Sequence, residues 1–322
     1  MKKIAILTSG GDSPGMNAAV RAVTRAAIYF GYEVVGIRYG YRGLIEGDFI
    51  DIQASGVSGI IQRGGTILKT ARSDKFMSPE GRTIAAENLK KRGINVLITI
   101  GGDGTFRGAT VLAAEHGIKV VGIPATIDND LIGSDETIGY DTALNTAMEA
   151  IDKIRDTADA HERLFLVEVM GRHAGFIALE TGIASGAELI ILPEAIKNIE
   201  EIKESLAETL KVHKRSTLIV VAEGEETGGA VNLCNELEKD FGKYDMRVCI
   251  LGHVQRGGSP TAHDRVLASR LGYEAINAIR EGESEVMVGV INNKCTITPL
   301  KETFGKIKEV NLDLLSMAKI LR

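Results

Sequence analysis

The sequence predicts an α/β protein with two doubly wound lobes, each a mostly parallel sheet covered by helices. Short apolar, β-branched runs alternate with longer helical patterns along most of the chain. These runs are mostly apolar, as expected for strands buried on both faces of a parallel sheet. The length of 322 residues suits one large or two medium domains.

The elements can be assigned in chain order from these patterns. IAIL (4–7) is a compact apolar run, a glycine-rich turn follows it, and a helical pattern then occupies 15–30. The further strand-like runs are 33–38, 95–100, 119–123, 164–169, 189–192, 217–222, 247–251 and 286–290. Helical patterns between them cover 79–92, 106–116, 140–158, 198–213 and 261–280. No linker rich in Pro or Ser divides the chain.

Composition excludes several classes of function. The formal charge is −5, from 38 basic and 43 acidic residues, whereas nucleic-acid and anionic-membrane binding both need a basic surface. Three separated cysteines without a C-x-x-C pair indicate reduced thiols rather than disulfides or a zinc site. The first residues contain no signal-peptide core, and no apolar run approaches a membrane span. We therefore expect a cytoplasmic protein with no nucleic-acid or membrane partner.

The stretch TSGGDSPGMN (8–17) follows the first strand and opens a helix. Adjacent glycines let a backbone approach a ligand closely, and a helix N-terminus offers free N–H groups to an anion. A plain tight turn is the simpler alternative. The same letters match the G-x-S-x-G pattern of serine hydrolases, but an elbow on the first strand lacks the earlier loop that supplies the oxyanion donor.

TIGGDGTFRG (99–108) also joins a strand to a helix and is more specific. Its glycines leave space for phosphates, and Asp103 places a carboxylate where a phosphate-bound Mg²⁺ would lie. A structural turn would explain the glycines but not the carboxylate among them. The motif is neither a P-loop nor a dinucleotide-binding fingerprint.

PATIDND (124–130) places Asp128 and Asp130 at the carboxyl end of the next strand, where open α/β sheets bind ligands. Two carboxylates at that edge suit a metal, a general base, or both. An Asx turn is the commoner role of such a tripeptide, but GGDG one strand earlier favours a functional role.

Several arginines at strand ends or beside glycines suggest phosphate binding, although any one of them alone would more often be a surface ion-pair partner. They are Arg63, Arg72, Arg163, Arg172 and Arg256. His253 could donate to a phosphate and Glu223 could bind sugar hydroxyls; a structural histidine and a turn cap are the alternatives.

Taken together, TSGGDSPGMNAAVR, GGDGT, TIDND, MGRHAG and GHVQRGGSP, in this order, resemble the bacterial ATP-dependent 6-phosphofructokinases over almost the whole chain. The resemblance implies transfer of a phosphoryl group from ATP to the 1-hydroxyl of fructose 6-phosphate, with Mg²⁺, in a homotetramer whose subunits share active sites. It also implies a nucleotide-binding lobe at 1–139 with 255–305, and a sugar-phosphate-binding lobe at 140–254 with 306–322.

The resemblance assigns roles to individual positions. ATP and its magnesium would be held by Gly11, Tyr41, Arg72, Gly102, Asp103, Gly104, Thr105 and Gly108, with Asp103 as the metal ligand. The reacting groups would meet Thr126, Asp128, Asp130 and Arg172, with Asp128 as general base and Arg172 stabilising the transferred phosphoryl group. The sugar phosphate would be held by Met170, Gly171, Glu223, His253 and Arg256, and from the neighbouring subunit by Arg163 and Arg247.

Two departures from the family pattern matter for donor and regulation. Pyrophosphate-dependent relatives carry Asp and Lys where this chain has Gly104 and Ala125, so ATP is favoured, while the Ala125 methyl group replaces the usual glycine. Of the positions at the effector site for ADP and phosphoenolpyruvate, those that match are Arg21, Arg25, Arg155, Glu188 and Lys214. Ala54, Gly59 and Val212 replace common Arg, Asp and Lys, which predicts weakened or altered allosteric control.

Three rival functions stay open at this level. NAD and lipid kinases share GGDGT but not TIDND with the MGR and HVQRGG motifs downstream. A pyrophosphate-dependent phosphofructokinase is the second choice. A sugar-phosphate-binding regulator without activity is the third, and it would not need Asp103, Asp128 and Arg172 together.

Overall fold

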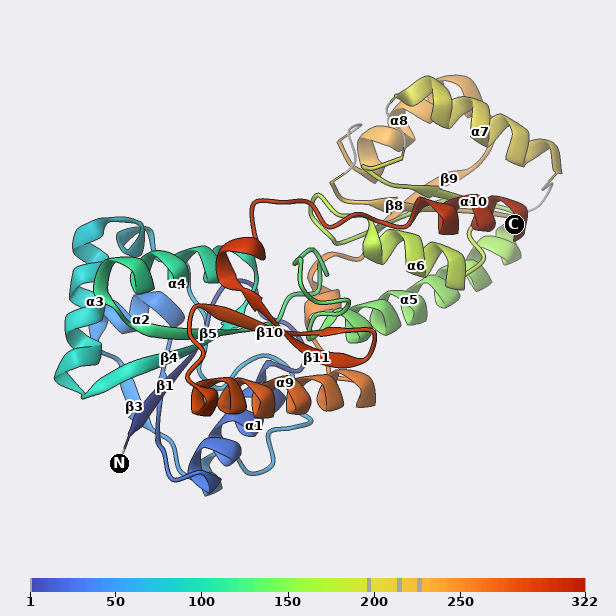
Figure 1. Cartoon of the computed structure of the whole chain (residues 1–322). Coiled ribbons are helices and arrows are strands. Elements are labelled where there is room, and N and C mark those ends of the chain that lie inside the picture. The colour runs from blue at the N-terminus through green and yellow to red at the C-terminus, as the bar shows by residue number, and fades with distance from the viewer. Residues whose placement is uncertain (1, 196–197, 213–215, 225–227, 322) are drawn as a thin grey trace. The chain divides into compact units, whose positions relative to one another are not determined.

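The computed structural model describes residues 2–195, 198–212, 216–224 and 228–321. The chain forms two compact units, Met1–Thr142 with Arg256–Lys308, and Ala143–Gln255 with Glu309–Arg322. In Figure 1 the first unit runs from blue to teal-green and returns in orange and red, and the second unit runs from green through yellow to light orange and ends in the dark red C-terminal helix. The unit boundaries lie at 142, 255 and 308, where the sequence predicts 139, 254 and 305.

The first unit is built on one twisted sheet, whose described strands have the order β11-β10-β5-β4-β1-β2-β3. The strands are β1 (Lys3–Thr8), β2 (Glu33–Ile37), β3 (Phe49–Asp51), β4 (Ile94–Gly101), β5 (Lys119–Pro124), β10 (Val286–Ile291) and β11 (Lys294–Pro299). All neighbours are parallel except the edge strands β3 and β11. Because β1 lies between β2 and β4, the order reverses there, and such a switch point is where open α/β sheets bind ligands.

Helices cover both faces of this sheet. On one face lie α1 (Met16–Tyr29) and α9 (Ala262–Glu281), and on the other α2 (Gly40–Glu46), α3 (Pro79–Lys91) and α4 (Asp103–His116) (Figure 1). Successive side chains of β1 alternate between the two layers: Ile4 and Ile6 pack on the α1 side, Ala5 and Leu7 on the α4 side. An entirely apolar strand is therefore required, which is why its sequence shows no polar alternation.

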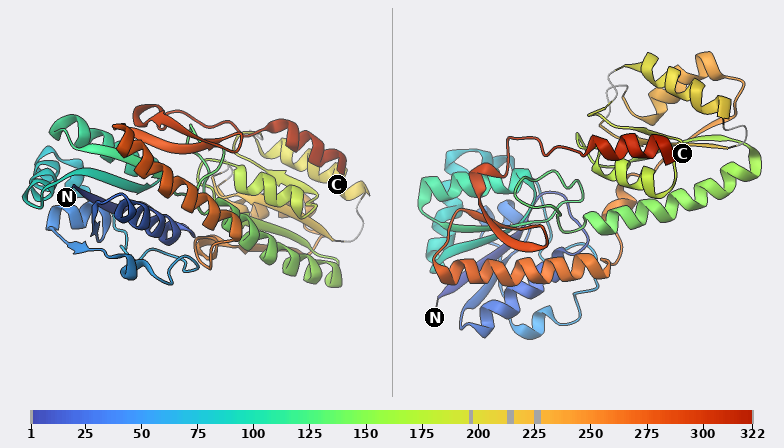
Figure 2. Two further views of the ribbon diagram at one scale, coloured as in Figure 1. Left: turned by 60° about the horizontal axis from the view of Figure 1, so that its bottom comes forward. Right: turned by 45° about the vertical axis from the view of Figure 1, so that its right-hand side comes forward.

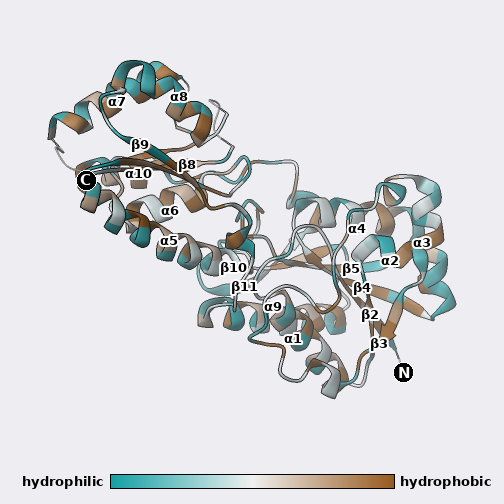
Figure 3. Cartoon of the chain, turned by 180° about the vertical axis from the view of Figure 1, so that it is seen from behind, coloured by the Kyte–Doolittle hydropathy of each residue, from teal (hydrophilic) through white to brown (hydrophobic). Residues whose placement is uncertain are grey.

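The second unit contains a smaller parallel sheet with the strand order β7-β8-β6-β9. Its strands are β6 (Leu164–Val169), β7 (Leu189–Ile191), β8 (Thr217–Ala222) and β9 (Met246–Ile250). Its helices are α5 (Tyr140–His161), which begins just before the unit boundary, α6 (Phe176–Ala184), α7 (Ile199–Val212), α8 (Ala230–Phe241) and α10 (Leu312–Leu321). Apolar residues of α7 and α8 cover one face of the sheet (Figure 2). Hydrophobic residues concentrate on strands such as β8 (Figure 3).

The α/β fold class predicted from the sequence is confirmed, and the structure adds elements to the predicted ones. The strands β3 and β11 run antiparallel at the two edges, and β11 follows β10 through a turn in which Asn292 and Asn293 have φ of 50° and 61°. The short helix α2 and the helices α6 and α8 are also additional. Short 3₁₀ helices occupy Ala54–Val57, Asp74–Met77, Gly252–Arg256 and Leu300–Glu302.

One helix starts earlier than predicted, so that the second half of the GGDG motif is helical. The sequence predicts a helix over 106–116, whereas α4 begins at Asp103. A carboxylate in the first turn is favoured by the helix dipole, which offsets the low helix propensity of the following glycine. Asp103, Gly104 and Thr105 therefore belong to the first turn of α4 instead of a free loop. No helix in the described part of the chain is long and apolar enough to cross a membrane.

Candidate functional site

The turn after β1 lies directly beneath an arginine from a distant part of the chain. A Cβ atom placed on Gly11 would stand 2.6 Å from Nη1 of Arg256, so only glycine leaves room for the guanidinium. Nη1 of Arg256 also donates to the carbonyl oxygen of Asp12, at 3.2 Å. The glycine turn and Arg256 therefore form one cationic surface at the carboxyl end of β1.

The turn after β4 leads into a helix N-terminus with open space beside it. Gly102 is extended (φ −105°, ψ −159°), Asp103 is the first residue of α4, and a Cβ on Gly104 would meet no described atom within 4 Å. The first N–H groups of a helix have no intrahelical acceptor and attract anions. This turn can therefore receive a phosphate group without a side chain in the way.

The carboxylate of Asp103 is held by a neighbouring arginine. Nε of Arg107 lies 2.9 and 3.1 Å from the two carboxylate oxygens, one helical turn along α4, and its guanidinium lies over the ring of Phe304. Both partners of the pair are partly exposed. No cluster of three or more His, Cys, Asp or Glu side chains that could hold a metal occurs among the described residues. A single carboxylate beside a phosphate site fits Mg²⁺, which is commonly held by one or two carboxylates and substrate phosphates.

Tyr41 and Gly108, both predicted to lie near a nucleoside, are in contact. A Cβ on Gly108 would be 3.0 Å from the Tyr41 ring, and Tyr41 stacks on Phe76 with ring centroids 4.0 Å apart. The Tyr41 hydroxyl donates to the carbonyl oxygen of Thr105 at 2.5 Å, and burial raises the pKa of this phenol. The tyrosine is thus a core residue that supports the first turn of α4. Phe76 is not among the residues predicted from the sequence. Arg72 is exposed on the preceding loop.

The loop after β5 carries the two predicted aspartates in different environments. The side chain of Asp128 is buried, with 3% exposed, whereas Asp130 is half-buried. The backbone N–H of Asp128 donates to Oγ1 of Thr126 at 3.2 Å, and Asn129 between the aspartates has φ of 51°. Asn129, which lies between the two aspartates, therefore adopts a left-handed backbone conformation, which asparagine tolerates better than most residues.

The three turns of the first unit meet at one edge of its sheet. The Cβ that Gly102 lacks would lie 3.5 Å from Cβ of Thr126, so the β4 and β5 turns are neighbours. Nη2 of Arg256 lies 3.9 Å from Oδ1 of Asp128. Arg256 therefore spans from the β1 turn to the buried aspartate. A buried carboxylate, an arginine and an open helix N-terminus at one edge can bind a phosphorylated substrate and accept a proton from it.

Ala125 fits the loop without displacing it. The residue is 1% exposed, packs in the core on the α1 side of the sheet, and donates its N–H to the carbonyl oxygen of Gly101 at 3.0 Å. The Ala125 methyl group is therefore accommodated in the apolar core.

In the second unit, the turn after β6 is shaped by Glu223 at the end of β8. Gly171 and Arg172 have φ of 143° and 55°, and the N–H of Arg172 donates to Oε1 of Glu223 at 2.8 Å. A Cβ on Gly171 would be 2.4 Å from the carbonyl oxygen of Ala174, so this turn requires glycine. The structure thus brings Gly171, Arg172 and Glu223 together, beside the buried Met170.

Arg163 and Arg247 share one acidic partner. Nε of Arg163 lies 2.6 Å and Nη2 of Arg247 lies 2.8 Å from the two carboxylate oxygens of Asp245. The hydrogen bond from Arg163, with the charge of Arg247, lowers the pKa of Asp245. The two predicted sugar-phosphate arginines therefore form one basic cluster, held by an aspartate that the sequence reasoning did not single out. His253 is exposed in the 3₁₀ helix Gly252–Arg256.

The predicted effector residues divide between the two units. Arg21 and Arg25 lie one turn apart on α1. In the second unit, Arg155 donates to Glu188 at 3.2 Å and to the carbonyl oxygens of Ser185 and Gly186 at 3.1 and 2.8 Å. Glu188 also accepts from the N–H of Leu218, so this pair supports local structure. Lys214 lies outside the described residues.

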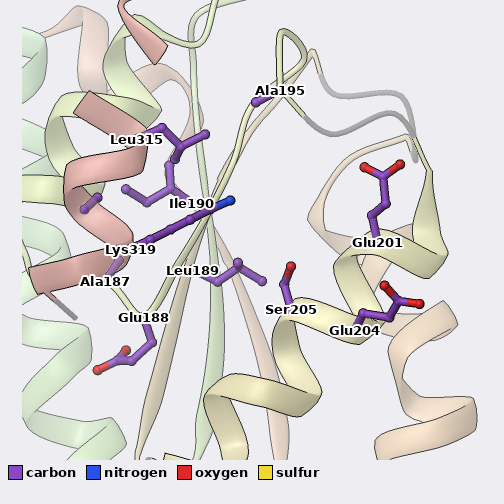
Figure 4. A pocket seen from close by; sticks show the side chains of 11 residues that line it. Ala187, Glu188, Leu189, Ile190, Ala195, Glu201, Glu204, Ser205, Leu315 and Lys319 are labelled. Atoms are coloured by element: carbon purple, nitrogen blue, oxygen red, sulfur yellow. The ribbon is translucent and has the colours of Figure 1, made fainter. Parts of the chain in front are cut away.

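A pocket of the second unit includes Glu188, one of the predicted effector-site residues, in its lining. It is lined by β7, α7 and α10, including Leu189, Ser205 and Leu315 (Figure 4). Its walls combine aliphatic side chains with Glu201, Glu204 and Lys319.

Comparison with known families and structures gives a consistent result. A family profile described as phosphofructokinase matches residues 3–279. The chain is 53% identical over 321 residues to "ATP-dependent 6-phosphofructokinase 2" of Bacteroides thetaiotaomicron, covering 100% of this chain and 98% of the relative. It is 54% identical to "ATP-dependent 6-phosphofructokinase 1" of Thermus thermophilus, covering 100% and 99%.

Solved structures agree. The phosphofructokinase of Saccharomyces cerevisiae matches 99% of this chain and 46% of its own, with a TM-score of 0.87 and 38% identity. A pyrophosphate-dependent phosphofructokinase from Marinobacter aquaeolei matches 97% of this chain and 86% of its own, with a TM-score of 0.84 and 23% identity. The second likeness concerns the fold alone.

Proposed function

This chain belongs to the phosphofructokinase family, and we propose that it transfers the γ-phosphoryl group of ATP to the 1-hydroxyl of fructose 6-phosphate. The observation that carries the proposal is the edge of the first sheet, where buried Asp128 lies within 4 Å of Arg256 and next to the turn that leads into α4. Phosphoryl transfer needs mainly positioning and charge neutralisation, and this edge supplies both.

Asp128 is the proposed general base. Its carboxylate takes the proton from the 1-hydroxyl as the oxygen attacks the γ-phosphorus, and Thr126 orients the loop by accepting the N–H of Asp128. Asp130 contacts the same reacting groups. Arg172 stabilises the charge on the transferred phosphoryl group.

ATP is bound, in this proposal, by the glycine turn of Gly11, by Arg72, and by the first turn of α4 from Gly102 to Thr105, with Tyr41 and Gly108 near the nucleoside. Asp103 is the residue that would hold Mg²⁺. When bound, the ion neutralises phosphate charge and orients the transferred group. Arg107, which holds the Asp103 carboxylate in this structure, would have to release it.

Fructose 6-phosphate is bound by Met170, Gly171, Glu223, His253 and Arg256. Arg163 and Arg247 act on the substrate of a neighbouring subunit in a homotetramer, and their common bond to Asp245 keeps the two guanidinium groups together. Control by ADP and phosphoenolpyruvate is weakened, because Ala54 and Gly59 offer neither the cation nor the carboxylate common in the family.

A coupled assay for fructose 1,6-bisphosphate with ATP or pyrophosphate as donor tests the proposal. We expect turnover with ATP alone; turnover with pyrophosphate would refute the donor assignment, and none with either would favour the binding-protein alternative. In Asp128→Asn, kcat should fall about a hundredfold to ten-thousandfold with KM nearly unchanged, since general-base catalysis contributes about 10²–10⁴-fold. Unchanged kcat would refute the base assignment.

A further inference from the structure

Lys308 is the last residue of the first unit and binds the loop that carries Asp128. Its ammonium donates to Oδ1 of Asn129 at 3.1 Å and to the carbonyl oxygens of Ser134 and Asp135 at 2.9 and 2.8 Å. An ammonium has three N–H donors, and here three acceptors are supplied by one loop. Such charge-assisted bonds are stronger than neutral ones.

The contact with Asn129 acts next to the proposed base. Asn129 lies between the two aspartates, is 4% exposed, and has a left-handed backbone conformation. Its side chain is fixed at both ends: Nδ2 donates to the carbonyl oxygen of Asp135 at 3.1 Å, and Oδ1 accepts from Lys308. Without the ammonium, Oδ1 and two carbonyl oxygens lose a charged donor, so the left-handed turn is less firmly held.

The loop beyond the aspartates is anchored to the sheet. Asn129 is held by the carbonyl oxygen of Asp135, by Oγ1 of Thr137 at 3.4 Å and by Lys308, which supplies the charged bond of these three. The N–H of Val290 donates to Oγ of Ser134, and the N–H of Asp135 donates to the carbonyl oxygen of Val290. These bonds fix the position of Ser134 and Asp135 against β10. Lys308 then links this fixed pair to Asn129, 179 positions away in the sequence.

We infer that Lys308 is a positioning residue for phosphoryl transfer: it holds Asn129 and thereby sets the direction of the Asp128 carboxylate. The inference rests on the proposed role of Asp128. A base displaced by about 1 Å can cost about a hundredfold in rate without loss of substrate binding. Lys308→Met, which keeps most of the length of the side chain and removes the charge, should therefore lower kcat by about tenfold to a hundredfold, with both KM values within threefold of the wild type.

The matched control is Lys306→Met, an exposed lysine two residues earlier, which should leave kcat unchanged. A chemical rescue experiment distinguishes a positioning role of Lys308 from a general effect on stability. Treating Lys308→Cys with 2-bromoethylamine restores an ammonium group at nearly the original distance from the backbone and should recover most of the lost kcat. Wild-type protein treated in parallel accounts for reaction at Cys234, Cys249 and Cys295. Thermal unfolding of each variant shows how much folded protein is present in the assay.

A double-mutant cycle tests the route through Asn129. If Lys308 acts through that side chain, Lys308→Met should cost little further kcat in an Asn129→Ala background. Three results would overturn the inference. The losses of kcat could be additive in the double mutant, or kcat of Lys308→Met could lie within twofold of the wild type. The loss of kcat could also merely follow the fraction of folded protein and not be rescued. If Asp128→Asn is inactive but Lys308→Met is fully active, the positioning role of Lys308 is refuted and the role of Asp128 as general base stands. If Asp128→Asn is itself active, the role of Asp128 as general base is refuted.

Discussion

Replacing Gly104 by Asp tests where the phosphates of ATP bind. A side chain at this position enters open space, since a Cβ there meets no described atom within 4 Å. A second carboxylate in the first turn of α4 is also favourable to the helix dipole. We therefore expect a Tm within about 2 °C of the wild type, since a surface substitution of this kind changes stability by about 0.5 kcal/mol or less. Any loss of activity in this variant can then be attributed to weaker binding of ATP instead of to unfolding.

The size of that loss follows from charge repulsion. Two unit charges 4 Å apart repel by about 1 kcal/mol in water and about 4 kcal/mol at the effective dielectric constant of a protein surface. The neighbouring Asp103 side chain is 38% exposed, which places the site between these limits. A value of about 2–3 kcal/mol corresponds to a rise of about 30-fold to 150-fold in KM for ATP, at about 1.4 kcal/mol per factor of ten.

The assay compares Gly104→Asp with Gly104→Asn, which has the same shape without the charge. KM for ATP is measured at saturating fructose 6-phosphate and at low and high salt. We expect a large rise for Asp, a small one for Asn, and a partial recovery for Asp in salt, which screens the repulsion. Equal KM values for the two variants would show that charge at 104 does not face the phosphates, and the donor argument would fail.

Four further predictions concern stability, its dependence on pH, and regulation. Asp264→Asn should lower the free energy of unfolding, measured by urea denaturation, by about 3 kcal/mol. The two oxygens of the buried carboxylate accept from the N–H groups of Gly139 and Thr142, and in asparagine one of these acceptors is replaced by an NH₂ donor. His263 has a raised pKa: burial lowers it, but the hydrogen bond and charge of Glu136, with other carboxylates, outweigh this. The ion pair of His263 with Glu136 is exposed and stabilises the fold by at most about 1 kcal/mol. This stabilisation is fully present below pH 6.5 and is lost as the pH rises above that value. The Tm difference between wild type and His263→Gln should shrink as pH rises above 6.5 and finally vanish, and a constant difference would contradict the assignment. Phe76→Leu removes the ring stacked on Tyr41 and should destabilise the protein by about 1 kcal/mol in thermal unfolding, whereas no change in Tm would show that the stacking is dispensable. Phosphoenolpyruvate should produce little sigmoidal inhibition of the velocity curve, and strong inhibition would refute the weakened effector site.

Periodicity and motif spacing in the sequence determined the fold class and the local form of the turns. Strands such as β1 and β8 are apolar from Ile4 to Leu7 and from Leu218 to Ala222 because both their faces are covered, so they are recognisable without a structure. Asp103 and Asp128 were singled out because each follows a predicted strand, Asp103 among glycines and Asp128 in a loop with a second aspartate. The start of α4 was predicted three residues late, since Gly102 and Gly104 hide a helix that begins between them.

Only the tertiary structure decided which of these turns meet. The placement of β1 beside β4, the position of Arg256 over Gly11, and the bond from Lys308 to Asn129 join residues far apart in the chain. Such contacts depend on strand order and on how loops close, and local residue patterns carry no record of either. For the same reason, the aspartate that pairs Arg163 with Arg247 could not be identified from the sequence, whereas the arginines themselves could.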